Sequence, residues 1–86
     1  MRVQNMISSK GNSVPNQFII TDNGTTYFQS YDTIIVKVTK DCIFLDENYW
    51  NYSITTSKYR NLFLGETKKE TEKKIKKGTY VLTDLN

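Results

Sequence analysis

The segment from Tyr49 to Gly65 constrains the fold most, because the spacing of apolar residues changes there from the alternation of strands to the period of a helix. Three consecutive hydroxyl side chains can accept hydrogen bonds from the free amides of a first helical turn: Thr55, Thr56 and Ser57. Apolar side chains then recur at helical spacing: Tyr59, Leu62 and Phe63. Gly65 stands where a terminating glycine is expected. The spacing predicts a short amphipathic helix over residues 55–64 whose apolar stripe lies on a sheet.

A second helix is predicted over residues 67–77. Thr67 and Glu70 have the spacing of a capping box, in which each side chain accepts a hydrogen bond from the backbone of the other residue. Gly78 follows the last turn, and that turn is rich in lysine, which suits the negative end of the helix dipole.

Before the helices, the sequence alternates in the manner of strands. Asn23–Gly24 separates the runs Gln17–Thr21 and Thr26–Tyr31, and Asn-Gly between two such runs is the strongest short signal for a hairpin. Further strands are expected at 33–39, 42–45 and 79–82. The sequence therefore predicts an α+β fold, a four-stranded antiparallel meander plus a C-terminal strand, with one face covered by helices 55–64 and 67–77.

Residues 1–16 are mostly polar or small and contain the only proline of the chain. Their apolar spacing is weak. We expect a flexible N-terminal arm over 1–16, followed by a single α+β domain over 17–86. A domain of 86 residues has a small core, so association into a homo-oligomer would help to stabilise it.

The composition argues against most kinds of catalysis. The chain has no histidine and one cysteine, Cys42, which excludes a Cys/His zinc site and the Ser-His and Cys-His nucleophile pairs. Cys42 precedes an apolar run, so we expect it to be buried. Asp46 and Glu47 are adjacent in sequence and would point apart in a strand, so they form no acid/base pair. We predict no enzyme activity and no cofactor.

The location follows from hydropathy. The longest apolar runs are too short to cross a bilayer, and no basic-then-apolar leader opens the sequence. We expect a cytoplasmic protein with no membrane partner.

One candidate binding surface is the sheet face opposite the helices. Alternation along 26–31 places Tyr27, Gln29 and Tyr31 together on that face. Further aromatic residues follow later in the chain: Tyr49, Trp50 and Tyr52. Such a surface could stack on bases or anchor a protein partner, whereas Trp50, the largest side chain, is expected to serve the core.

A second candidate lies at the start of helix 55–64. Lys58 and Arg60 follow the three hydroxyl residues Thr55, Thr56 and Ser57, and free amides with nearby cations suit a phosphate or carboxylate. The alternative is that the hydroxyls only cap the helix and that water solvates the cations.

The lysines of helix 67–77 allow a third interpretation. Contacts to a nucleic acid backbone would come from four of them: Lys69, Lys73, Lys76 and Lys77. Against this, Glu70 with Lys74, and Glu72 with Lys76, have the spacing of ion pairs on a solvated helix face.

Several strings in the sequence resemble a family of small bacteriophage proteins of undefined function. They are Asn16-Gln17-Phe18-x-Ile20, Phe28-Gln29-Ser30-Tyr31-Asp32, Tyr49-Trp50-x-Tyr52-Ser53-x-Thr55-Thr56-Ser57-Lys58-Tyr59, Phe63-Leu64-Gly65-Glu66-Thr67, and Lys76-x-Gly78-x-Tyr80-x-Leu82-x-x-Leu85-Asn86. The resemblance implies a phage product in the host cytoplasm. It brings no catalytic residues with it.

By analogy with other small phage proteins, we expect a non-enzymatic inhibitor of host defence, in the manner of anti-CRISPR proteins. Its partner would be a host protein or a small signalling nucleotide. The alternative is a nucleic-acid-binding module that uses helix 67–77 and the surface aromatics.

Overall fold

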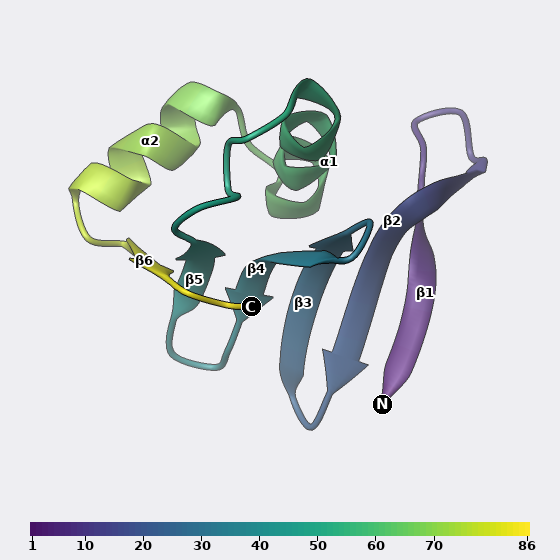
Figure 1. Cartoon of the computed structure of the whole chain (residues 1–86), viewed down its shortest axis with the longest axis horizontal. Coiled ribbons are helices and arrows are strands. Elements are labelled where there is room, and N and C mark those ends of the chain that lie inside the picture. Colours follow the sequence, from purple (N-terminus) through teal and green to yellow (C-terminus); the bar gives the residue numbers. More distant parts are fainter.

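The computed structural model describes all residues from 1 to 86. Six strands form one sheet in chain order, and two helices separate the fifth strand from the sixth (Figure 1). The strands are β1 (Arg2–Ile7), β2 (Ser13–Asp22), β3 (Thr25–Ser30), β4 (Thr33–Val38), β5 (Ile43–Asp46) and β6 (Tyr80–Thr83). Neighbours are antiparallel except β5 and β6, which are parallel because the chain returns through the helices.

Helices α1 (Ile54–Leu64) and α2 (Lys68–Lys76) lie on the same side of the sheet, α2 toward β6 and α1 toward β3 (Figure 1). The Phe63 ring of α1 stacks on Phe28 of β3, with 5.6 Å between the ring centroids. Two residues further along β3, the hydroxyl of Ser30 shares a hydrogen bond of 3.0 Å with the hydroxyl of Thr56 in α1. These contacts confirm an α+β fold in which helices cover one sheet face.

The core lies between the helices and the sheet. Its buried members are Met6, Phe28, Ile35, Val36, Leu45 and Tyr80. Ile35 and Val36 are neighbours in sequence, yet both are buried, which strict alternation does not allow. The register explains this, since Phe28 pairs with Val36 and Gln29 with Ile34, leaving Ile35 in a bulge.

The sheet has one more antiparallel strand than the sequence predicted. Residues 1–16 were expected to form a flexible arm, but they supply β1 and the start of β2, and Met6 is only 3% exposed. The pairing carries an irregularity between Asn5 and Ile7, and Met6 is the only buried residue of β1. An edge strand that buries so little has a weak hydrophobic pattern, so the sequence did not reveal it.

The helix boundaries nearly match the prediction, but one cap differs. The cap of α1 is Ser53, whose hydroxyl accepts from the Thr56 amide at 3.1 Å, so Thr55 to Ser57 belong to the first turn instead. Both hydrogen bonds of the Thr67–Glu70 capping box are present, as predicted. Gly65 ends α1 with φ of 70°, a conformation that favours glycine.

Two side chains expected inside lie outside. Leu62 is 49% exposed, and Arg60 occupies the inner face of α1 in its place. Cys42 is exposed, because it lies in the turn between β4 and β5, ahead of the first β5 residue.

Asp46, at the end of β5, joins three parts of the chain and is fully buried. Its Oδ2 accepts from the amides of Asn48 and Tyr49, at 3.1 and 3.0 Å. Its Oδ1 accepts from the Leu85 amide at 2.8 Å and from the Asn86 side chain at 3.0 Å. Asp46 therefore shapes the loop that leads into α1 and holds the segment after β6 against the sheet.

No helix is long and apolar enough to cross a membrane.

Candidate functional site

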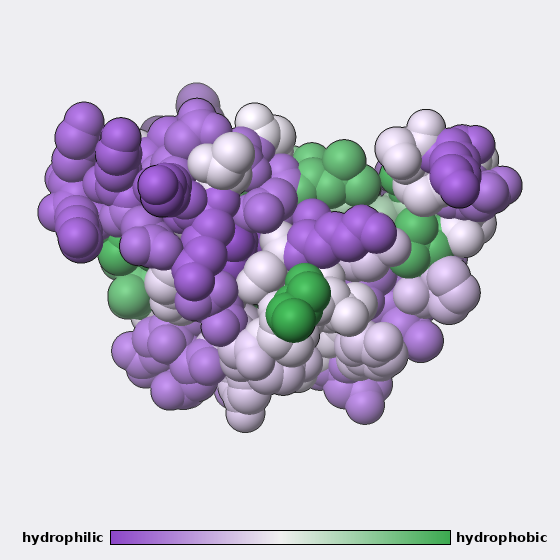
Figure 2. Space-filling view, turned by 90° about the horizontal axis from the view of Figure 1, so that it is seen from above, coloured by the Kyte–Doolittle hydropathy of each residue, from purple (hydrophilic) through white to green (hydrophobic).

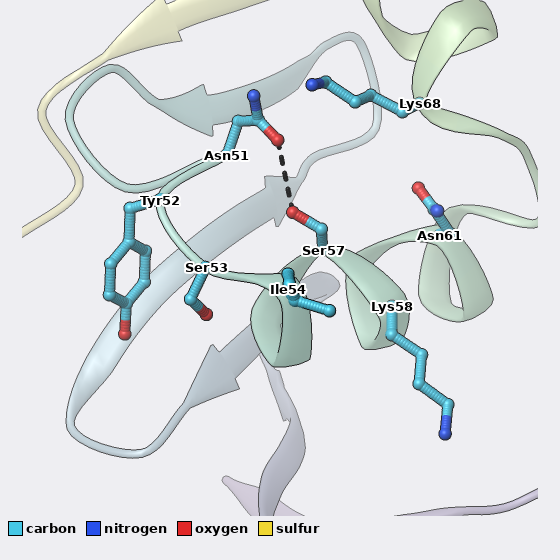
Figure 3. Close-up of a pocket in the computed structure, with 8 residues that line it drawn as sticks. All are labelled: Asn51, Tyr52, Ser53, Ile54, Ser57, Lys58, Asn61 and Lys68. Carbon is cyan, nitrogen blue, oxygen red and sulfur yellow. Dashed lines mark hydrogen bonds between the residues drawn. The ribbon is translucent and has the colours of Figure 1, made fainter.

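A shallow groove of about 600 Å³ lies beside the start of α1 (Figure 3). Its lining comes from the β5–α1 loop, from α1 and from the first residue of α2: Asn51, Tyr52, Ser53, Ile54, Ser57, Lys58, Asn61 and Lys68. We call this the α1 groove. Because Gly65 turns the chain sharply after α1, the start of α2 returns close enough for Lys68 to complete the lining.

Hydrogen bonds hold the polar side of the α1 groove. The Ser57 hydroxyl donates to the Asn51 side-chain oxygen at 3.2 Å, and Figure 3 shows Lys68 extending toward Asn51. Asn61 accepts from the buried Arg60 at 2.8 Å. Amide and hydroxyl groups of this kind can donate to, or accept from, a bound polar chain.

The two cations of the α1 groove do not converge. Their ammonium groups point in different directions in Figure 3. Lys58 has no carboxylate within 4.0 Å, and its Nζ lies 5.3 Å from the centroid of the Tyr59 ring. Lys68 is 3.9 Å from Glu72, a loose exposed pair that contributes little. The arrangement therefore offers two separated positive contacts and no single cradle for one anion.

Exposed apolar side chains stand beside these cations. Ile54 is 91% exposed and Tyr52 is 50% exposed. The Tyr49 ring packs edge-on against Tyr52 with 5.2 Å between centroids, which fixes an aromatic pair at the surface. Exposed Ile and Tyr next to cations are typical of a contact surface.

Arg60 is fully buried, so it is not the surface cation that the sequence suggested. Its guanidinium donates to the Trp50 carbonyl, to Ser57 at 3.3 Å and to Asn61 at 2.8 Å, and lies 5.2 Å from the centroid of the Trp50 ring. Burial lowers the pKa of Arg60, and the charges of Glu66 and Glu72 partly oppose this. Arg60 thus positions two groove residues, Ser57 and Asn61, from the buried side of α1. It also supports Trp50, which packs against the core as expected.

The structure separates the predicted residues of the helix start. Ser57 and Lys58 line the α1 groove, whereas Thr56 is buried against Ser30, and Thr55 is exposed outside the lining. Tyr52 was named as a surface aromatic, and five further groove residues were not predicted: Asn51, Ser53, Ile54, Asn61 and Lys68. Asn61 and Lys68 lie four and eleven residues beyond the hydroxyl run, and only the helical repeat and the turn at Gly65 bring them to it.

The predicted sheet-face set is also divided. Tyr27 and Gln29 follow alternation and lie opposite Phe28, away from the helices. Tyr31 lies beyond the end of β3 with φ of 56°, in a turn where its carbonyl accepts from the Gln29 side chain at 2.6 Å. Tyr31 is half exposed but does not continue the row of Tyr27 and Gln29.

The exposed surface of α2 is strongly hydrophilic, as Figure 2 shows on its left side. The expected pairs of Glu70 with Lys74 and of Glu72 with Lys76 do not form. Lys74 pairs instead with Glu66 at 2.6 Å, and Glu72 lies nearest Lys68. Four lysines remain exposed with no carboxylate within 4.0 Å: Lys69, Lys73, Lys76 and Lys77.

Fold and site together define a small α+β domain, a six-stranded mixed sheet with a helix layer on one face and a shallow polar groove at a helix start. No group of three or more Cys, Asp or Glu side chains is arranged to hold a metal ion. The chain belongs to DUF8033, a family of unknown function, whose family model matches residues 1–79. No curated protein and no solved structure matches the chain.

Proposed function

We propose that this protein is a non-enzymatic binding protein that recognises an acidic, partly apolar segment of another protein in the α1 groove. The observation that carries the proposal is that the exposed Ile54 and Tyr52 line the same groove as two cations, Lys58 and Lys68. Apolar anchors give affinity when they are desolvated, and cations at the rim select for negative charge and speed association.

The shape of the α1 groove favours a protein segment over a small molecule. Pockets for small ligands usually bury most of the ligand, whereas this groove is shallow and its central isoleucine is almost fully exposed. Lys58 and Lys68 point apart, so they suit carboxylates spread along a chain better than one compact phosphate. An extended acidic segment satisfies both features.

The resemblance to small phage proteins suggests that this binding takes place during phage infection. In that setting the protein acts in the cytoplasm of an infected bacterium and occupies the surface of a host protein, with inhibition of host defence as the result. Capture of a small signalling nucleotide is the other form of the same hypothesis, and the experiment below separates the two.

Charge reversal at Lys58 and Lys68 tests the proposal. Affinity purification from a bacterial lysate is compared between the native protein, the Lys58→Glu, Lys68→Glu variant, and a control, Lys10→Glu, Lys40→Glu, whose lysines are exposed in turns outside the groove. We expect a partner with an acidic segment to be retained by the control and weakened about tenfold or more by the groove variant.

Equal retention by both variants would contradict the proposal. A thermal-shift series with cyclic nucleotides is run in parallel, because a ligand that binds the folded state raises the melting temperature by mass action. A rise with added nucleotide that disappears in the groove variant would favour nucleotide capture instead.

The alternative function, nucleic acid binding, is favoured by one observation. Lys69, Lys73, Lys76 and Lys77 recur at helical spacing and none is paired with a carboxylate. If all four contact phosphates of duplex DNA, the logarithm of affinity should fall with the logarithm of salt with a slope of about −3.6, and Lys69→Ala, Lys73→Ala should reduce that slope by about half. Absence of binding to generic DNA or RNA at low salt would end this alternative.

A further inference from the structure

A continuous row of side chains crosses the sheet face that points away from the helices. The registers pair Val3 with Ile20, Ile20 with Tyr27, Tyr27 with Lys37, Lys37 with Phe44, and Phe44 with Val81. Directly paired residues lie on the same face of a sheet, so these six residues form one line from β1 to β6. We call this line the outer row.

The outer row is apolar apart from Lys37, and no helix covers it. Tyr27 precedes Phe28, which stacks on α1, so the row lies on the opposite face. Val3 is 53% exposed and Val81 39%, and the four residues between them are partly exposed. Lys37 also lies against this surface, since its Nζ is over the Phe44 ring, 5.9 Å from the ring centroid, and the methylenes of a lysine side chain are apolar.

A second line beside the outer row extends this surface. Asn5 pairs with Phe18, Phe18 with Gln29, and Gln29 with Ile34, which adds two large apolar side chains. A contiguous apolar face of this kind on a small domain marks an interaction surface.

The order of residues along the outer row is self-complementary. Two identical sheets can pack face to face about a two-fold axis that runs along the strands, which reverses the strand order of one sheet over the other. Val3 then meets Val81 of the second copy, Ile20 meets Phe44, and Tyr27 meets Lys37. Each apolar side chain faces an apolar one, and the only cation faces a tyrosine ring, a favourable pairing.

We infer that a second copy of this chain covers the outer row, so that the protein is a face-to-face dimer. A foreign partner is less well supported, because the row carries one charge and offers little to select such a partner, whereas its own order fits itself. The domain also gains what it lacks, since only 13 of 86 residues are buried in the single chain.

The α1 groove lies on the helix side of the sheet, so the dimer leaves both grooves open. A dimer would present two grooves, and loss of the dimer need not abolish recognition at one of them.

The mass of the protein in solution tests the dimer. Sedimentation velocity should give about twice the 10.0 kDa of one chain for the native protein at about 100 µM. Tyr27→Lys should weaken the dimer about 100-fold, because it places a lysine against Lys37 of the second copy at two symmetric positions. Leu62→Lys, an equally drastic change on the exposed side of α1, should leave the mass unchanged.

A compensating variant separates lost contacts from misfolding. Tyr27→Lys combined with Lys37→Tyr exchanges the two central residues and restores a cation facing a tyrosine, so dimer mass should return. Cooperative thermal unfolding of each variant confirms that it is folded. A native protein that is a monomer at about 100 µM, or a dimer that Tyr27→Lys leaves intact, would overturn the inference.

Discussion

Replacing Asp46 by alanine should lower the free energy of unfolding by about 3–4 kcal/mol. The carboxylate is fully buried and accepts four hydrogen bonds, two from the loop toward α1 and two from the segment after β6. Without it, backbone amides at both places lose their acceptor, and a buried polar group without a partner is costly. Urea denaturation followed by the fluorescence of Trp50, the only tryptophan, measures the effect.

The matched control is Asp41→Ala. Asp41 is exposed in the turn between β4 and β5 and should change stability by less than about 0.5 kcal/mol. If Asp46→Ala were as stable as this control, Asp46 would not be the link between the two segments.

Replacing Glu66 by glutamine should cost about 2 kcal/mol near neutral pH, because hydrogen bonds to a charged acceptor are stronger than those to a neutral one. Its carboxylate accepts from Lys74 at 2.6 Å, from the Tyr80 hydroxyl at 2.7 Å and from the Thr71 hydroxyl at 2.6 Å. The side chain is only 4% exposed, so water cannot replace these donors. The network ties the start of α2 to its end and to β6.

The same residue predicts how stability depends on pH. Burial raises the pKa of Glu66, but the hydrogen bonds from Lys74, Thr71 and Tyr80 together lower it by more. The pKa of Glu66 in the folded protein is therefore lower than its ordinary value. The folded pKa therefore lies below the unfolded value of about 4.3, so the stabilisation is present above that pH and is lost as pH falls through the folded pKa. Glu66→Gln should flatten the acid limb of the stability profile.

The alkaline limb has the opposite sign. The hydrogen bond to Glu66 raises the pKa of Lys74. Burial raises the pKa of Tyr80, and the hydrogen bond to Glu66 raises it as well. Stabilisation from both groups is present below their unfolded pKa values, about 10, and is lost as pH rises through the folded values. Glu47→Gln, an exposed control, should change stability by less than about 0.5 kcal/mol, and an unchanged acid limb in Glu66→Gln would contradict the role of the network.

Local chemistry explains which parts of the fold the sequence predicted. Asn23 and Gly24 have φ of 48° and 82°, the conformation that an Asn-Gly hairpin turn requires, and both arms pair as expected. Gly65 ends α1 and the Thr67–Glu70 capping box starts α2, both as predicted. Each of these signals acts within a few residues, so the local sequence reveals it. The strand β1 gave no such signal, because its pairing to β2 is irregular and buries a single side chain.

The inner face of α1 shows why the site was only partly predicted. Thr56, Arg60 and Phe63 recur at helical spacing and face the sheet, but two of the three are polar. An apolar pattern therefore selected Leu62 in error and placed Arg60 outside. Thr56 can be buried because it shares a hydrogen bond with the Ser30 hydroxyl, and Arg60 because it donates to the Trp50 carbonyl. Both partners lie outside α1, so the helical pattern alone does not reveal them. Ser57 and Lys58 were predicted because they lie on the exposed side, where local sequence suffices.

The most direct test of the proposed contact surface is photo-crosslinking from position 54. Benzoylphenylalanine in place of Ile54 puts a reactive group in the middle of the α1 groove, and the same residue in place of Leu62 serves as the control on the outer side of α1. After irradiation in bacterial cells, mass spectrometry identifies the linked peptide. We expect one protein to be linked at position 54, through a segment rich in Asp and Glu, and not to be linked at position 62. No adduct at position 54, or the same adducts at both positions, would contradict the proposed contact surface.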